Sequence, residues 1–281
     1  MAVSLPPVSP SGDQAFREIA AEMGLSPDDV WAGGYAEYEW QHSRHAFETL
    51  GIPIAGAEVL EFGCNVGAST VVLAALGARV TAVDVDDAVL RLARANIARY
   101  GIAGSVSLHH VRDTSHLPFK DAQFDLVCCN SVLEYVPNAQ LAAVKTEIDR
   151  VLKPDGILFI TGTSSRLWPR EVHSGRWLVN WLPRRLDRFF GRPGYQRGVW
   201  PWEIRYGYGS QYRNLDWNDQ GAAWIRARRL RGLKGWPLTR LMVLNAAARL
   251  FRTSAGMLTP NIAVRLQKPK CAIRTPVDDG C

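Results

Sequence analysis

Small and acidic residues follow one short apolar run in the first quarter of the chain. The stretch VLEFGCNVGAST, residues 59–70, passes from apolar residues into Gly63, Asn65 and Gly67, and a small-residue helix pattern follows. A turn between a strand and a helix lets a ligand approach bare backbone at the helix N-terminus. Asn65 stands where a middle glycine would be, and asparagine tolerates positive φ. The stretch predicts a ligand-binding turn, and Glu61 beside it suits a ligand with an ammonium group.

Two further acidic residues follow later apolar runs. Asp84 closes VTAVDVD, where a carboxylate can accept hydrogen bonds from both hydroxyls of a ribose. Asp113 follows the next apolar run, where a carboxylate can accept from an adenine amino group while Thr114 offers backbone. A pyrophosphate would prefer a glycine-rich helix N-terminus with no acid at hand. The acids therefore favour an adenosyl ligand over a dinucleotide.

Alternating strand and helix patterns position these residues. Apolar runs predict strands at 57–62, 78–85, 105–111, 124–130 and 157–162, and helical patterns lie between them at 67–77, 87–101 and 138–152. Such repeated units form a parallel sheet with right-handed crossovers and helices on both faces. The Lys-Pro-Asp-Gly sequence at 153–156 is expected to be a turn.

The regular alternation stops after Gly162. We expect AAWIRARRL (222–230) as a sixth strand, PLTRLMVLNAAARLF (237–251) as a helix and NIAVRLQK (261–268) as the last strand. The predicted organisation is a helical N-terminal lid segment (1–50), a ligand-binding domain (51–162), a basic substrate-side insertion between strands five and six (163–215), a segment that completes the sheet (216–270) and a tail (271–281). Aromatic and histidine residues in the lid segment, Tyr35, Tyr38, Trp40, His42 and His45, could cover the ligand or simply pack on the core.

Positive charge is concentrated after the fifth strand. Between Arg166 and Arg252 there are 18 Lys and Arg but 5 Asp and Glu, whereas the whole chain carries +6. This imbalance indicates an anionic substrate or surface, or else a solvated basic face. Residues 176–192 interleave aromatic residues with arginines, which suits peripheral membrane contact, a lipid-linked or phosphorylated acceptor, or a packed substrate lid. No nucleic-acid-binding module is visible, so nucleic acid is not expected as a partner.

Composition sets the remaining expectations. The five cysteines are odd in number and lack zinc-site spacing, so we expect free thiols and no metal. No apolar run is long enough to span a membrane, and the N-terminus does not read as a secretion signal. The expected location is the cytoplasm, with the inner membrane face as an option, and the oligomeric state is left open.

Four stretches together resemble class I S-adenosylmethionine-dependent methyltransferases of the small-molecule branch. They are VLEFGCNVGAST, VTAVDVD, RDTSHLPFKDAQFDLVCCNSVLEYV and EIDRVLKPDGILFITG. The resemblance implies an α/β fold, a Rossmann-like, doubly wound sheet of seven mostly parallel strands. It also implies S-adenosyl-L-methionine as cofactor and methyl transfer as the activity.

The resemblance also implies particular cofactor contacts. Gly63, Asn65 and Gly67 would line the methionine end of the cofactor. Asp84 would bind the ribose, Val85 the adenine face, Asp113 the adenine amino group and Asn130 the methionine part. With the two residues argued above, the full set of cofactor-binding candidates is Glu61, Gly63, Asn65, Gly67, Asp84, Val85, Asp113, Thr114 and Asn130.

Three residues are candidates for the chemistry on the acceptor. A hydroxyl acceptor usually needs a base, and His173 follows the fifth strand in a loop that could reach over the cofactor, with Glu171 orienting it. Glu134 follows the fourth strand at the same edge of the sheet. The RLWPREVH sequence before LVNWLP resembles bacterial methyltransferases associated with glycans and glycolipids. The predicted activity is therefore methylation, most simply at oxygen, of a small-molecule, glycan or lipid-linked acceptor.

Two other functions fit part of the same pattern. A nicotinamide-dependent oxidoreductase would share the strand, turn and Asp84, but the spacing of the glycines and the presence of Asp113 oppose it. A non-catalytic module could bind the cofactor and lack an acceptor pocket.

Overall fold

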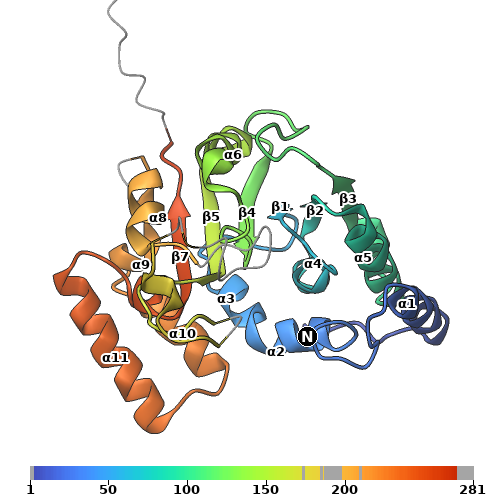
Figure 1. Cartoon of the computed structure of the whole chain (residues 1–281), viewed down its shortest axis with the longest axis horizontal. Helices are drawn as coiled ribbons and strands as arrows, with labels where there is room; N and C mark the ends of the chain where they lie inside the picture. Colours follow the sequence, from blue (N-terminus) through green and yellow to red (C-terminus); the bar gives the residue numbers. More distant parts are fainter. Residues whose placement is uncertain (1–2, 173–174, 184–185, 187–197, 209–210, 271–281) are drawn as a thin grey trace, which may run out of the picture.

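A seven-stranded sheet forms the centre of the computed structural model, which describes residues 3–172, 175–183, 186, 198–208 and 211–270 (Figure 1). In spatial order the strands are β3 (Val106–His110), β2 (Arg79–Asp84), β1 (Glu58–Phe62), β4 (Phe124–Asn130), β5 (Leu152–Ser164), β7 (Asn261–Gln267) and β6 (Arg213–Asn214). The pairs from β3 to β5 are parallel, and β7 is antiparallel to β5 and β6. The predicted α/β class with a mostly parallel sheet is confirmed.

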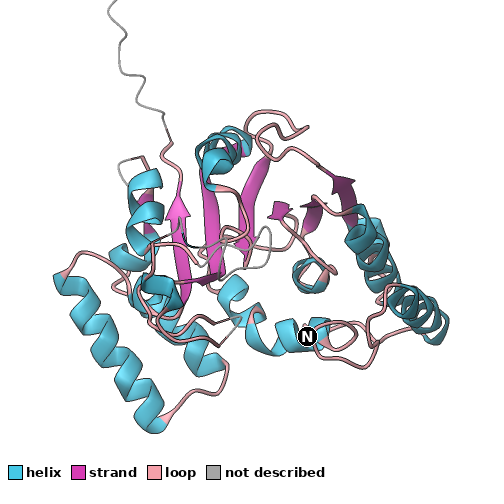
Figure 2. Cartoon of the chain, in the orientation of Figure 1, coloured by secondary structure: helices cyan, strands magenta, loops and turns pink. Residues whose placement is uncertain are grey.

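Helices cover both faces of this sheet (Figure 2). Those that the structure describes are α1 (Pro10–Glu22), α2 (Tyr35–His42), α3 (Arg44–Glu48), α4 (Ala68–Ala75), α5 (Asp87–Arg99), α6 (Asn138–Val151), α8 (Pro201–Tyr208), α9 (Leu215–Asn218), α10 (Ala222–Leu230) and α11 (Gly235–Leu250), with 3₁₀ turns η1 (Ala103–Ser105), η2 (Val179–Trp181) and η4 (Ala255–Leu258).

Alternation along β1 divides the core into two parts. Leu60 and Phe62 pack with residues of α6 and α8, whereas Val59 packs with residues of α4, α2 and α3. Side chains on a strand point alternately to opposite faces, so each face of β1 buries its own apolar layer. The strand is therefore buried on both faces from Val59 to Phe62, as expected for a central parallel strand.

The N-terminal segment is fastened to the far edge of the sheet. Helix α1 lies along α5 (Figure 1), and the buried Arg99 of α5 donates to Asp13 of α1 at 3.0 Å and to the carbonyl of Gly33. Asp86 caps α5 by accepting from the backbone of Ala88 at 2.9 Å. These contacts hold the chain that leads into α2 above the carboxyl ends of the strands.

The prediction of a turn at residues 153–156 is wrong. These residues belong to β5, where Asp155 N–H donates to the carbonyl of Lys268 and Lys268 N–H donates to the carbonyl of Gly156. Asp155 adopts a φ of 62°, and the pairing of β4 with β5 shifts between Phe124 and Leu126. The Pro-Asp-Gly sequence is thus an irregular part of β5. It stays extended because the residues at the end of β7 form backbone hydrogen bonds with it.

The expected sixth strand at residues 222–230 is also wrong. This segment is helix α10, with Trp224, Ile225 and Ala227 buried on one side, and the sixth strand is the two-residue β6. Alanine, arginine and leucine favour helices, and the burial follows helical rather than alternating spacing. The helix predicted at 237–251 and the last strand are confirmed as α11 and β7. The predicted basic insertion, 163–215, falls partly outside the described residues.

Candidate active site

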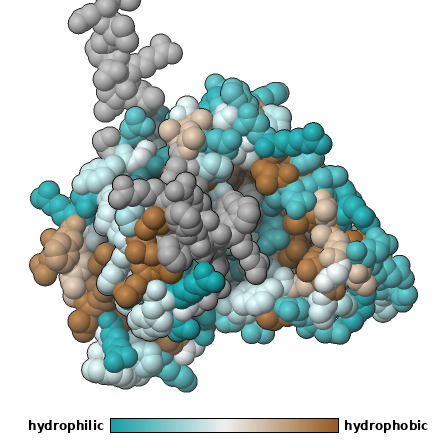
Figure 3. Space-filling model, viewed as in Figure 1, coloured by the Kyte–Doolittle hydropathy of each residue, from teal (hydrophilic) through white to brown (hydrophobic). Residues whose placement is uncertain are grey.

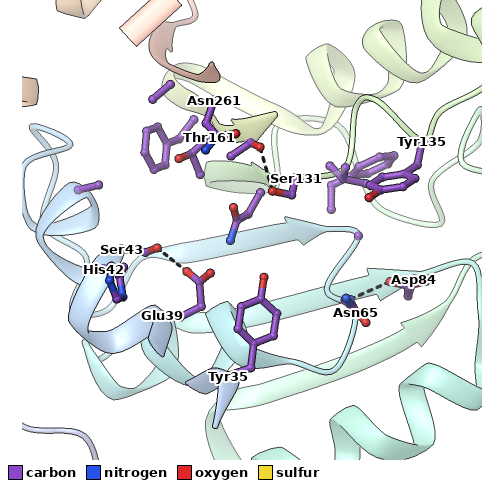
Figure 4. Close-up of a pocket in the computed structure, with 18 of the residues that line it drawn as sticks. Tyr35, Glu39, His42, Ser43, Asn65, Asp84, Ser131, Tyr135, Thr161 and Asn261 are labelled. Carbon is purple, nitrogen blue, oxygen red and sulfur yellow. Dashed lines mark hydrogen bonds between the residues drawn. The ribbon is translucent and has the colours of Figure 1, made fainter. Parts of the chain in front are cut away.

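A cavity of about 1270 Å³ opens at the carboxyl ends of β1, β2, β4 and β5. Helix α2 forms one wall, while α10 and the first residues of β7 form another. Figure 4 shows side chains from these separate elements turned toward the same space. Ligands of open α/β sheets bind at this edge, so the cavity lies where the sequence predicts a site.

The turn after β1 holds three residues in left-handed backbone conformations. Gly63, Asn65 and Gly67 have φ of 77°, 48° and 76°. A Cβ at Gly63 would lie 2.3 Å from Cγ2 of Val132, so only glycine fits there. Asn65 N–H donates to Asp84 Oδ2 at 2.8 Å, which fixes the turn against the end of β2. Gly63 and Asn65 line the cavity, whereas Gly67 begins α4 behind them.

Glu61 lies behind the turn and outside the cavity lining. Its side chain is fully buried and accepts hydrogen bonds from the hydroxyls of Ser69 and Thr70 on α4. Burial raises the pKa of Glu61 to about 7, although the two hydroxyls oppose the rise. The structure therefore places Glu61 as a tie between β1 and α4 rather than in reach of a ligand's ammonium group.

The predicted adenosine end is only partly assembled at the cavity. Asp84, Val85 and Thr114 line it, and Val85 is 56% exposed. Asp113 does not line it, because its Oδ1 accepts from the backbone N–H of Ser115 at 2.9 Å and from the Ser115 hydroxyl. The carboxylate predicted to meet an adenine amino group is thus engaged in its own loop.

The opposite end contains a carboxylate that the sequence analysis missed. Glu39 of α2 is only 5% exposed, lines the cavity beside Asn130 and Tyr35, and accepts from the Ser43 hydroxyl. Burial raises the pKa of Glu39. Figure 4 shows Glu39 and Tyr35 pointing into the same space. Helical spacing of Tyr35, Glu39 and His42 was the available signal, since it puts them on one face of α2.

His42 has one ring nitrogen held by the backbone of its own helix, which defines its tautomer. Its Nδ1 lies 2.7 Å from the backbone carbonyl of Tyr38, and its ring stacks on the Tyr38 ring with centroids 3.9 Å apart. A carbonyl can only accept, so Nδ1 carries the hydrogen and the neutral ring keeps its lone pair on Nε2. His42 lines the cavity.

Two of the three predicted catalytic residues, Glu134 and Glu171, lie outside the cavity lining. Glu134 accepts from the backbone N–H of Ser164 at 3.2 Å, and Glu171 accepts from the Ser164 hydroxyl at 3.4 Å. Both carboxylates are fully buried, and neither lines the cavity. His173 lies outside the described residues. In the conformation described, the two carboxylates support the end of β5 from behind.

Comparison with known proteins identifies the class. Residues 60–160 match the family model described as "Methyltransferase domain". This match to a methyltransferase domain supports the class I resemblance and S-adenosyl-L-methionine as the methyl donor. The predicted family and cofactor are confirmed. The residues present suit this cofactor, because the backbone of Gly63 and Asn65 and the carboxylate of Asp84 line the same cavity.

Two curated relatives and one solved structure illustrate the similarity. The chain is 32% identical to a ubiquinone biosynthesis O-methyltransferase of Xylella fastidiosa, covering 50% of this chain and 58% of that protein. It is 26% identical to the Haemophilus ducreyi protein of the same name, covering 68% and 74%. A structure solved as a candidate sarcosine dimethylglycine methyltransferase from Galdieria sulphuraria matches with a TM-score of 0.52 and 14% identity, covering 96% and 94%. The chain thus spans little more than half of the Xylella relative's length.

Proposed function

We propose that this protein transfers the methyl group of S-adenosylmethionine to a small-molecule acceptor bound in the same cavity. One observation carries the proposal: a single cavity joins the turn at Gly63 and Asp84 to a wall made by α2 and α10. Sites for one small ligand measure roughly 300–1,000 Å³. The cavity, at about 1270 Å³, has room for a cofactor and an acceptor together.

The cofactor would lie along the strand ends from β2 to β4. Asp84 would accept from the ribose hydroxyls, with Val85 and Thr114 beside the adenine. Asn130 and Glu39 would hold the methionine end, and a nearby cation would favour the charged form of Glu39, whose burial opposes it. When bound, the cofactor supplies an electrophilic methyl group on its sulfonium.

We place His42 as the base for an acceptor hydroxyl. Nε2 of the neutral ring would take the hydroxyl proton as the new oxygen–carbon bond forms, while the Tyr38 carbonyl holds Nδ1–H at 2.7 Å. The stacked Tyr38 ring fixes the orientation of the imidazole. This assignment replaces Glu134 and Glu171, which stand behind the wall, and it supports methylation at oxygen.

The proposed acceptor is a small molecule, which includes glycan and lipid-linked compounds. The partly described 176–192 segment presents Trp177, Leu178 and Trp181 to solvent, and they are 66%, 55% and 54% exposed. Trp236 and Leu250 of α11 are exposed as well. Figure 3 shows hydrophobic residues on the surface at the lower left, the side on which Figure 1 places α11. Within the described part of the chain, none of the helices has the length and apolar character to cross a membrane. Flotation with anionic vesicles at low salt would support peripheral contact, and its absence would exclude it.

Calorimetric titration tests the proposal. The protein should bind S-adenosylmethionine and S-adenosylhomocysteine and ignore NAD(H). Incubation with S-adenosylmethionine and a panel of phenolic, sugar and carboxylic acceptors should then release S-adenosylhomocysteine. Binding of a dinucleotide instead would favour the oxidoreductase alternative. Cofactor binding with no turnover of any acceptor would favour the non-catalytic module.

A further inference from the structure

Two arginines at the C-terminal end of α10 line the acceptor end of the cavity, Arg228 within the helix and Arg231 as its C-cap. Arg228 and Arg231 are three residues apart, so they lie on the same side of the helix, and both line the cavity. They also line an adjoining cavity of about 440 Å³, together with Trp224 and Asn261. The pair therefore stands where the two spaces meet.

No described carboxylate compensates this pair of charges. Among the residues that the structure describes, none forms an ion pair with Arg228 or Arg231 within 4.0 Å. The neighbouring Asp216 is already held by Arg265, whose Nε lies 2.7 Å from Asp216 Oδ1 and whose backbone N–H donates to Oδ2. Glu39 accepts from the Ser43 hydroxyl and forms no ion pair with either arginine.

The surroundings of Arg228 make its charge unfavourable in the protein alone. Its side chain is half-buried, and burial and the nearby Arg231 lower the pKa of Arg228. Its guanidinium carbon lies 5.1 Å from the centroid of the Trp224 ring, which holds the side chain in place. Arg231 beside it is exposed, and an anion that contacted both side chains would offset the repulsion that acts on Arg228.

The other arginines of α10 lie elsewhere. Arg226 and Arg229 are exposed and line neither cavity, and Arg229 instead contacts the sulfur of Met242 on α11. The helix thus directs only some of its charge toward the acceptor space. Leu233, Leu241 and Pro260 make the adjoining cavity apolar beyond the arginines.

We infer that Arg228 and Arg231 bind an anionic group, a carboxylate or a phosphate, on the methyl acceptor. The inference rests on the proposed function and deepens it by naming the class of acceptor. An oxyanion between the two guanidinium groups would leave the rest of the acceptor free to extend toward α2 and His42 or into the apolar side cavity.

Ligand titration with model anions tests the inference. The probes are benzoate, phenyl phosphate and the neutral benzyl alcohol, each measured by quenching of tryptophan fluorescence with and without saturating S-adenosylhomocysteine. The wild type should bind one or both anions and bind benzyl alcohol at least about tenfold more weakly. Arg228→Gln and Arg231→Gln should each weaken anion binding roughly tenfold to a hundredfold. Arg226→Gln, on the same helix, is the matched control and should bind as the wild type does.

Separate readouts keep this inference distinct from the proposed function. Calorimetric affinity for S-adenosylhomocysteine should be the same in the wild type and the three variants. If the wild type does not bind S-adenosylhomocysteine, the result contradicts the proposed function and leaves the anion site untouched. Arg228→Gln should keep or raise the melting temperature, which shows that the variant folds. A preference for phenyl phosphate identifies a phosphate acceptor and a preference for benzoate a carboxylate. Equal anion binding by Arg226→Gln and the two cavity variants, or equal binding of benzyl alcohol, would overturn the inference.

Discussion

The cofactor end and the acceptor end of the cavity are built in different ways. The cofactor end comes from successive strand ends, from the turn at Gly63 to Asn130. The acceptor end combines α2, α10 and the start of β7, which are far apart along the chain. One end is thus a local product of repeated strand–helix units, and the other depends on how distant helices dock.

The two ends also differ in how their charges are satisfied. Asp84 receives the N–H groups of Asn65 and Asp86, and Glu61 receives two hydroxyls. At the acceptor end Arg228 and Arg231 have no carboxylate among the described residues. The carboxylates at the proposed cofactor end are therefore fixed by hydrogen bonds within the protein. The two arginines at the proposed acceptor end have no such partner in the described part of the chain and could bind an anionic ligand.

The largest effect is expected from His42 at the acceptor end. His42→Gln should lower kcat roughly 10²- to 10⁴-fold for a hydroxyl acceptor, because no group then takes the proton. Calorimetric affinity for the cofactor should stay unchanged. His45→Gln is the control, since His45 pairs with Glu48 and does not line the cavity. An unchanged kcat in His42→Gln would refute the assignment of the base.

At the cofactor end, Glu61 should make stability depend on pH. Burial raises its pKa from 4.5 to about 7, so the folded protein favours the neutral form. The stabilisation from that form is complete below pH 4.5 and is lost as the pH rises through 7. It amounts to about 3 kcal/mol, as an order of magnitude.

Urea unfolding at pH 5 and pH 8 measures this effect. The fall in unfolding free energy between the two pH values should be smaller in Glu61→Gln than in the wild type, because glutamine does not titrate. Glu58→Gln on the same strand, where the side chain is partly exposed and pairs with Arg79, should keep the wild-type fall. The same fall in Glu61→Gln would show that Glu61 does not carry it.

The smallest effect is expected from Asp84. Asp84→Ala should weaken binding of S-adenosylhomocysteine by about 1–3 kcal/mol, or roughly 5- to 150-fold, through lost hydrogen bonds to the ribose. Isothermal calorimetry measures the change directly. Asp87→Asn, in the first turn of α5 and away from the cavity lining, should bind normally. Equal affinity in the two variants would remove Asp84 from the site.

The sequence predicted the cofactor end better than the acceptor end, for physical reasons. Strands β1, β2 and β4 carry strong local signals, and an acid that ends a parallel strand must lie at the ligand edge, as Asp84 does. Asp113 shows the limit, because a neighbouring serine turned its carboxylate into the loop. The sequence pattern predicts the backbone position of such a residue, whereas its short-range hydrogen bonds determine the direction of its side chain.

The acceptor end depended on docking that no local pattern encodes. Glu39 and Arg228 face the cavity only because α2 and α10 pack around it from distant parts of the chain. The charge imbalance indicated an anionic partner, but it could not identify two arginines among many. Reading 222–230 as a strand also hid the helical spacing that brings Arg228 and Arg231 to one side.

A crystal structure with S-adenosylhomocysteine tests most directly whether one cavity serves both cofactor and acceptor. The ribose should lie at Asp84, the adenine beside Val85 and the amino acid end near Asn130 and Glu39, with open space left toward Arg228. A ligand bound elsewhere, or one that fills the cavity as far as α10, would contradict the shared site.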